Sequence, residues 1–230
     1  MNAMKIFIIV LGIVLVWIIW GLLTSGSGVE LAGLLDASLP TVITKKIPSS
    51  ASDENWAYSI WFSVDKWESG AKKGIMYVGN NDANGPALEM VLADNKNVVE
   101  VILYDKTGAP HSCYVNDIPL QKWTHIIVSL DGKGVHIYKD GKIETTCTLE
   151  SNFNVAEHKK EMQVGESTKN GGFAGFLAKP TKYEDSISPQ QAWGKYREGA
   201  SSGGLFGFLS EYGFKLAVTK GGSDWTKLEI

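Results

Sequence analysis

The segment between residues 123 and 149 restricts the possible folds of this chain more than any other segment. It contains two turns with the pattern Asp-Gly, at Asp131-Gly132 and at Asp140-Gly141. The flanking runs, rich in β-branched and aromatic residues, cover 123–130, 135–139 and 142–149. Asp-Gly between such runs is a strong hairpin pattern, because both residues tolerate the positive φ angles of tight hairpin turns. The segment therefore predicts a three-stranded antiparallel meander.

Strands are also predicted upstream of this meander. From Trp56 to Val64 the even-numbered residues are all large and apolar, which is the period of two that a strand shows. Further short strands, separated by turn-forming residues, are predicted at 37–47, 74–79, 87–93, 98–104 and 111–115. No convincing helical period of ten residues lies between them, which disfavours parallel βαβ units. The sequence predicts a mainly β fold, an antiparallel two-sheet sandwich of the jelly-roll type.

Composition limits the class of protein. The chain has 230 residues, of which 44% are hydrophobic and 20% are charged, and this balance excludes a disordered or collagen-like chain. With 22 basic and 25 acidic residues there is no excess of positive charge, so nucleic acid is not expected as a partner. Two cysteines are too few for a disulfide scaffold or a four-cysteine zinc site.

Residues 6–23 form an apolar run without a charge. At about 1.5 Å per residue, an 18-residue helix reaches about 27 Å, close to the thickness of a bilayer's hydrocarbon core. Trp17 and Trp20 lie toward its C-terminal end, where indoles can sit at the headgroup level. A cleaved signal peptide, with the small residues 25–28 as its cleavage site, and a buried helix are the alternatives. We expect a retained anchor in residues 1–23, with the bilayer as partner of residues 6–23.

The remaining chain divides into three predicted parts. Residues 24–36 are predicted to be a stalk, residues 37–199 the folded domain, and residues 200–230 a C-terminal extension. Lys5 precedes the apolar run and no basic residue follows it until Lys45, which favours a cytoplasmic N-terminus in a single-pass membrane protein.

Several segments resemble one known superfamily. The segment 123–143, WTHIIVSLDGKGVHIYKDGKI, resembles the meander of concanavalin A-like, laminin G-like domains. Residues 58–64 with Trp67 resemble an early strand of that family, and the segments 175–183 and 187–199 resemble its closing strand and short helix. The resemblance covers about residues 37–199 and implies the jelly-roll fold. It implies little about a ligand, because the shared positions are packing and turn residues.

The C-terminal extension has a narrower resemblance. Residues 196–199 followed by 203–218 resemble an extension on laminin G-like proteins of large icosahedral DNA viruses that carry an internal membrane. This implies a minor capsid protein that tethers a protein shell to the internal membrane of a virion, with capsid or other assembly proteins as partners. The apolar residues of the extension should cap the sandwich or dock on a partner. They are Leu205, Phe206, Phe208, Leu209, Phe214 and Leu216. Trp225 is expected at an interface.

Two functions from different classes remain at this stage. The first is the non-enzymatic, membrane-anchored structural protein of a virion, or otherwise of a cell or organelle membrane. The second is a membrane-anchored carbohydrate-binding, lectin-like module, which the fold alone supports.

Catalysis is not expected. Retaining glycosidases of the superfamily need two carboxylates about 5 Å apart, which an alternating acidic run on one strand supplies. The chain has no such run. The adjacent pairs Asp53-Glu54 and Glu184-Asp185 would point to opposite faces of a strand and are expected in solvated loops. No motif for a nucleophile elbow, a phosphate-binding loop or a zinc protease is present, so neither catalytic residues nor a cofactor is predicted.

Metal sites have weak support in the sequence. His111, His125, His136 and His158 lack the spacing of a metal site, although the hairpin could bring His125 and His136 together across two strands as a zinc or copper site. The family resemblance implies a calcium site at the rim of the sandwich. Asp82, Asp94 and Asp105 are its possible donors, and solvated loop positions are the alternative for them.

Two cysteines and five tryptophans complete the candidates. Cys113 and Cys147 each lie at the end of a predicted strand and either form a disulfide, in an oxidising compartment, or stay half-buried thiols. Five tryptophans are predicted as core or packing residues, namely Trp56, Trp61, Trp67, Trp123 and Trp193. An exposed tryptophan would instead support sugar stacking.

Overall fold

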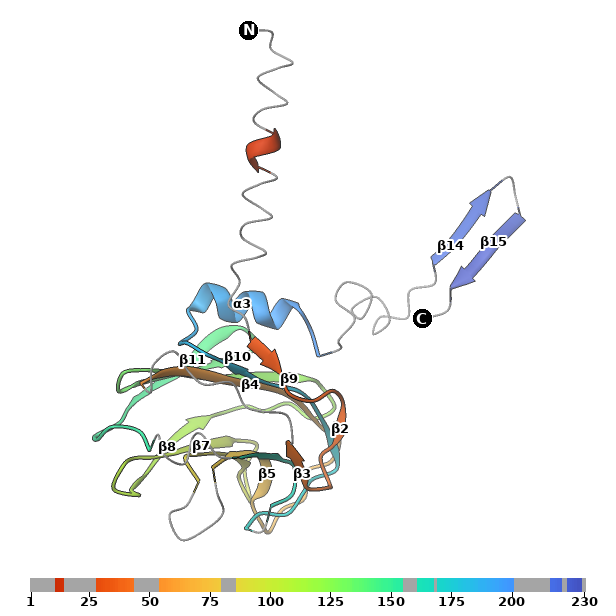
Figure 1. Cartoon of the computed structure of the whole chain (residues 1–230). Helices are drawn as coiled ribbons and strands as arrows, with labels where there is room; N and C mark the ends of the chain where they lie inside the picture. The colour runs from red at the N-terminus through yellow and green to blue at the C-terminus, as the bar shows by residue number, and fades with distance from the viewer. Residues whose placement is uncertain are drawn as a thin grey trace, which may run out of the picture.

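Two antiparallel sheets lie face to face, and one helix covers the outer side of the first sheet (Figure 1). The computed structural model describes residues 11–14, 28–43, 54–79, 86–154, 161–167, 169–200, 216–220 and 223–228, the last two ranges by their backbone. The predicted antiparallel two-sheet sandwich is confirmed.

The first sheet has seven strands in the order β1-β13-β4-β9-β10-β11, with β2 also paired to β13. Its strands are β1 (Gly28–Glu30), β2 (Leu35–Asp36), β4 (Asn55–Val64), β9 (Thr124–Asp131), β10 (Gly134–Lys139), β11 (Lys142–Thr148) and β13 (Gly175–Tyr183). The second sheet has six strands in the order β3-β12-β5-β6-β7-β8. Its strands are β3 (Thr41–Ile43), β5 (Lys73–Val78), β6 (Leu88–Leu92), β7 (Val99–Tyr104), β8 (Pro110–Val115) and β12 (Met162–Val164). A separate antiparallel pair joins β14 (Leu216–Lys220) to β15 (Ser223–Leu228).

Strands β9, β10 and β11 form the predicted meander. Gly132 has φ 60°, and the second turn has φ 50° at Asp140 and 75° at Gly141. The loop at 140–141 has positive φ at both central residues, and the loop at 132–133 has it at its first, Gly132. Two-residue loops with such angles match the twist of their strands, and glycine and aspartate adopt them at little steric cost. The turn chemistry therefore fixes the register of β9 with β10 and of β10 with β11.

Strand β4 has buried side chains on both of its faces. Its even-numbered residues, such as Trp56 and Phe62, belong to the main core between the two sheets. On its other face, Ala57 belongs to a smaller apolar cluster beneath the helix α3 (Pro189–Arg197). This second cluster consists of Ala57, Ile127, Tyr138, Tyr183, Ile187 and Ala192. Burial on both faces explains why β4 is almost continuously apolar.

Local hydrogen bonds hold α3 against the seven-stranded sheet. Ser188 caps its N-terminus in a capping box with Gln191, and Pro189 occupies the first turn, where its missing N–H costs nothing. The Tyr138 hydroxyl donates to the Ile187 carbonyl at 2.8 Å, and the Ile187 N–H donates to the Ser129 hydroxyl at 2.8 Å. The helix start is thereby fixed to β9 and β10.

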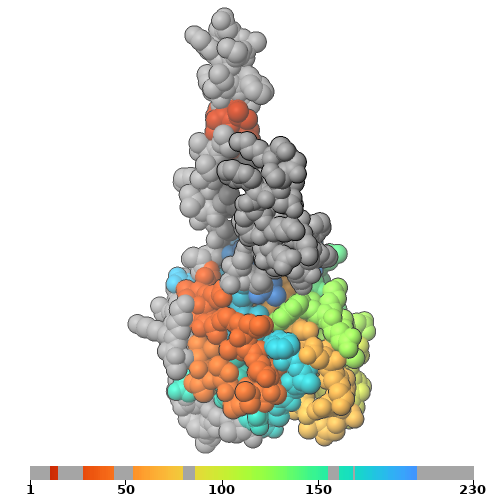
Figure 2. Space-filling model, turned by 90° about the vertical axis from the view of Figure 1, so that its right-hand side faces the viewer, coloured from red at the N-terminus to blue at the C-terminus, as the bar shows by residue number. Residues whose placement is uncertain are grey.

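The segment from residue 28 to residue 43 differs from its prediction. In place of one strand at 37–47, the chain forms β1 and β2 on the first sheet and then crosses to the second sheet as β3. Figure 2 shows these residues, in orange, along one edge of the sandwich. The crossing turn is held by Asp36, whose carboxylate accepts hydrogen bonds from the Ser38 N–H and hydroxyl. The sheet therefore begins at Gly28, inside the predicted stalk of residues 24–36.

The predicted anchor and extension lie mostly outside the described residues. Residues 11–14 are helical, and within the described ranges no helix combines the length and apolar character needed to cross a bilayer. The rest of the run 6–23 lies outside them, as do Phe206, Phe208 and the side chain of Trp225.

Candidate functional site

Three loops at one end of the six-stranded sheet enclose a pocket, which we call the loop-end pocket. Trp67 comes from the loop between β4 and β5, residues 95–98 from the turn between β6 and β7, and residues 116–120 from the loop between β8 and β9. Because neighbouring strands of this sheet are antiparallel, these connections all meet at the same end. The pocket is lined by Trp67, Asn95, Lys96, Asn97, Val98, Asn116, Asp117, Ile118, Pro119 and Leu120.

Backbone hydrogen bonds tie the walls of the loop-end pocket together. The Ile118 N–H donates to the Asn97 carbonyl at 2.9 Å, which joins two of the loops, and the Lys139 ammonium donates to the Asn116 carbonyl at 2.8 Å. Asp117 and Gln121 have φ 55° and 56°, a conformation that residues other than glycine seldom adopt. Such local strain, held by the surrounding structure, is common at binding sites.

The side chains of this pocket combine one aromatic ring with planar polar groups. Trp67 is half-buried and packs against the main core, so its position is fixed. Asn95, Asn97 and Asn116 are exposed, and each amide can donate and accept hydrogen bonds, while Asp117 adds an exposed acceptor. A ring with hydrogen-bonding groups around it suits a ligand that has an apolar face and many hydroxyl groups.

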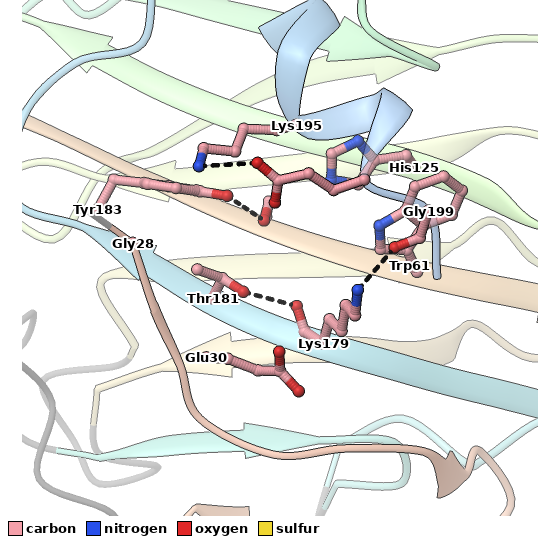
Figure 3. A pocket seen from close by; sticks show the side chains of 11 residues that line it. Gly28, Glu30, Trp61, His125, Lys179, Thr181, Tyr183, Lys195 and Gly199 are labelled. Atoms are coloured by element: carbon pink, nitrogen blue, oxygen red, sulfur yellow. Dashed lines mark hydrogen bonds and ion pairs between the residues drawn. The ribbon is translucent and has the colours of Figure 1, made fainter. Parts of the chain in front are cut away.

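A second pocket lies beneath the C-terminal turn of α3, between the helix and the seven-stranded sheet (Figure 3). The Lys179 ammonium donates to the Gly199 carbonyl at 2.9 Å, and the Lys195 ammonium donates to Glu198 at 3.1 Å. The first contact fastens the helix end to β13, and the second stays within the last turn of α3. We interpret this pocket as part of the packing of α3.

His125 lies at the floor of this second pocket. Its ring stacks on Trp61 at 4.5 Å between centroids, and Trp61 stacks in turn on Tyr196 of α3 at 5.5 Å. Burial lowers the pKa of His125 to about 3, and the nearby Lys179 charge adds a smaller contribution in the same direction. The imidazole is therefore neutral at physiological pH, and its buried Nδ1 has no hydrogen-bond partner among the described residues.

Two buried glutamates share the outer face of the six-stranded sheet. Glu89 of β6 is 4% exposed and Glu100 of β7 is 8% exposed, and their strand partners place both side chains on one face. The Tyr104 hydroxyl donates to Glu89 at 2.9 Å, and Lys72 donates to Glu100. Burial and the Glu89 charge raise the pKa of Tyr104, and the Glu100 hydrogen bond raises that of Lys72. The sequence analysis did not predict this pair, because it considered only carboxylates that alternate along one strand, and Glu89 and Glu100 lie on two strands.

The two described candidate calcium donors, Asp94 and Asp105, do not share a site. Asp94 lies before β7 and Asp105 directly after it, so the strand separates them by about 20 Å, and Asp82 lies outside the described residues. Asp105 instead stabilises a turn. Its carboxylate is hydrogen-bonded to the Thr107 hydroxyl, to the N–H groups of Thr107 and Ala109, and to His111. These hydrogen bonds hold the pKa of Asp105 well below its usual range. Within the described ranges, no group of three or more His, Cys, Asp or Glu side chains could hold a metal.

The alternative of a two-histidine site at His125 and His136 does not hold in the structure. The register of β9 with β10 pairs His136 with Ser129, whereas the His125 N–H donates to the Asp140 carboxylate at the far end of the hairpin. His136 lies within 3.3 Å of the Thr146 hydroxyl. His158 lies outside the described residues.

Cys113 and Cys147 form a disulfide that joins β8 to β11, so the first of the two predicted alternatives holds in the structure.

Of the tryptophans, Trp56 and Trp61 are buried as predicted, and Trp67 and Trp123 are half-buried. Trp193 differs from its prediction, because 45% of it is exposed on α3. The exposed pair Glu184-Asp185 lies in the loop before α3, as predicted, and Glu54 is exposed while Asp53 lies outside the described residues.

The two-sheet antiparallel sandwich with a short helix on its outer face places the chain in the class of jelly-roll β-sandwich domains. Residues 41–192 match the family Laminin_G_3, described as the concanavalin A-like lectin/glucanases superfamily, and the chain belongs to this family. Among curated proteins, none matches the chain by sequence.

Solved structures with a similar fold include receptor-binding domains of botulinum neurotoxins. The serotype D ligand-binding domain in complex with N-acetylneuraminic acid shares 12% identity and a TM-score of 0.58, with 74% of this chain and 45% of that chain covered. The receptor-binding domain of the C/D mosaic serotype shares 16% identity and a TM-score of 0.57, covering 71% of this chain and 41% of that chain. The chain thus spans less than half the length of these structures, and at such identities the similarity shows the fold alone.

Proposed function

We propose that this protein is a membrane-anchored, non-enzymatic glycan-binding module whose loop-end pocket holds the sugar. The observation that carries the proposal is the grouping of Trp67 with three asparagine amides and Asp117 around one pocket. A sugar ring offers one apolar face to an aromatic side chain and hydroxyl groups to planar amides and carboxylates. The complex of the serotype D domain with N-acetylneuraminic acid supports this choice of ligand class.

The absence of catalysis is part of the same proposal. Glu89 and Glu100 are the buried carboxylates that lie on one sheet face, and each is already bonded to a hydroxyl and lies beside a lysine. Such a network stabilises a sheet face by neutralising its charges. It supports a structural role for the pair.

Glycan binding is tested with the detergent-solubilised full chain on an array of sialylated and neutral oligosaccharides. We expect binding to at least one class, and Asp117→Asn should weaken it about tenfold, because a hydrogen bond to a charged group contributes about 1.5 kcal/mol. Asparagine tolerates the left-handed backbone at this position, so the loop should keep its shape. Asp185→Asn, an exposed substitution in the loop before α3, is the matched control. A chain that binds no oligosaccharide, or an Asp117→Asn variant that binds as well as the control, would contradict the proposal.

The anchor is tested by removing residues 1–23. The charge-free run 6–23 supports insertion, and we expect the full chain to leave membranes only in detergent, whereas the truncated chain should be released without it. Sequential extraction with salt, carbonate and detergent, followed by mass spectrometry of the N-terminus, makes the measurement. Release of the full chain by carbonate, or a natural N-terminus beyond residue 23, would refute the retained anchor.

The virion-tether function stays a prediction from the sequence. It depends on residues 203–218, whose apolar side chains would need a partner in water. The same extraction separates the two functions, because a tether should enter the detergent fraction together with shell proteins.

A further inference from the structure

The first strand of the sandwich starts beside the C-terminal turn of α3. Gly28, the first residue of β1, is paired with Tyr183, whose side chain belongs to the apolar cluster beneath the helix. Gly28 also lines the same pocket as Lys195 and Glu198 of the helix end (Figure 3). A chain that enters the domain at Gly28 therefore enters it on the side that α3 covers.

The distance between this entry point and the predicted anchor is short. Four residues, 24–27, separate the end of the apolar run from β1. Even when fully extended, four residues reach about 14 Å. If residues 6–23 span a bilayer, the α3 side of the domain lies next to the headgroups.

The exposed surface on that side has the side chains that a headgroup region favours. Gln190, Trp193, Gly194 and Arg197 form the exposed stripe of α3, and 45% of Trp193 is exposed. Beside the helix, Ile143 of β11 is paired with Tyr138, which lies under α3, and 53% of Ile143 is exposed. An indole prefers the interface between lipid and water, and arginine can bond lipid phosphates.

We propose that this α3 face, made of Gln190, Trp193, Gly194 and Arg197 with Ile143 of β11, rests on the headgroups of the membrane that holds the anchor. The proposal depends on the anchor of the proposed function and adds an orientation to it. The seven-stranded sheet faces the membrane, and the outer face of the six-stranded sheet faces away from it. The loop-end pocket, built mainly from loops of the six-stranded sheet, then stays accessible to glycans.

A fluorescent probe tests the orientation in the full chain. Both natural cysteines are in the disulfide, so an introduced cysteine is the only free thiol. Gln190→Cys and the control Tyr114→Cys, which is exposed on the outer face of the six-stranded sheet, are labelled with NBD and reconstituted in phosphatidylcholine vesicles that contain doxyl-labelled lipid. We expect the doxyl lipid to quench the probe at residue 190 and to leave the probe at residue 114 bright. Adding Trp193→Ser should reduce the quenching at residue 190.

Flotation of the vesicles separates the possible failures. A chain that floats with equal quenching at both positions keeps its anchor but overturns the orientation. An unquenched probe at residue 190 in a floating chain also overturns it, and would mean that the C-terminal extension or another partner covers the α3 face. A chain that does not float refutes the anchor, and the orientation with it.

Discussion

Replacing Cys113 and Cys147 together by serine is expected to lower the free energy of unfolding by about 3 to 4 kcal/mol. The disulfide spans 34 residues of sequence, and removing it restores the conformational entropy of that loop in the unfolded chain. It also joins β8 to β11, the strands at one edge of each sheet, which belong to different layers and share no ladder of hydrogen bonds. Urea unfolding of the full chain in detergent, followed by tryptophan fluorescence, measures the change.

Reduction provides the control for this experiment. Wild-type protein treated with dithiothreitol should unfold at nearly the same urea concentration as the double variant, because both lack the covalent link. An oxidised wild type that unfolds at the same urea concentration as the reduced protein would contradict the stabilising role.

The parts of the fold that local sequence determines were predicted closely. The two Asp-Gly turns specify their own φ angles, so β9, β10 and β11 follow from residues within a few positions of each other. Strand β4 was also predictable, because burial on both faces leaves a long apolar run. In these segments, propensity, patterning and turn chemistry agree.

Strands that exist only through distant partners were not predictable in this way. β1 and β2 have three and two residues, and they are strands because β13, far away in sequence, offers its edge to them. The segment 24–36 therefore looked like a stalk. Short strands carry too few residues for a pattern of period two to emerge.

The candidate site was harder to predict than the fold. Trp67 was predicted as a packing residue, and it packs on the core while its polar neighbours come from loops about 30 and 50 residues later. In sequence, Asn95 and Asn116 resemble any solvated turn residues. Glu89 and Glu100 were missed because only the register of β6 against β7 places them on one face. The sequence does contain one signal of this pair, because β6 and β7 each carry a single glutamate among apolar residues.

Acidification from pH 7 to pH 5 is expected to destabilise the domain through His125. Its pKa in the folded state is about 3, whereas an exposed histidine in the unfolded chain has a pKa of about 6.5. Between these values the unfolded state binds one more proton than the folded state, so stability falls as the pH falls. At pH 5 the loss is about 2 kcal/mol, from about 1.4 kcal/mol for each pH unit below 6.5. His125→Phe should remove this loss, because a phenyl ring can stack on Trp61 in place of the imidazole and carries no titrating group.

A variant at a second histidine is the control: it separates the effect of His125 on the pH dependence of stability from that of other titrating groups. His136→Phe changes a histidine on β10 and keeps His125, so its urea midpoint should fall with pH in parallel with the wild type. The curve of His125→Phe should instead be flatter, and the gap between it and the wild type should change by about 2 kcal/mol over this interval. Parallel curves for all three proteins would mean that the folded domain opens enough to protonate His125 without unfolding. In that case the stack of Trp61, His125 and Tyr196, and with it the attachment of α3 to the sheet, would be looser than the burial of these rings indicates.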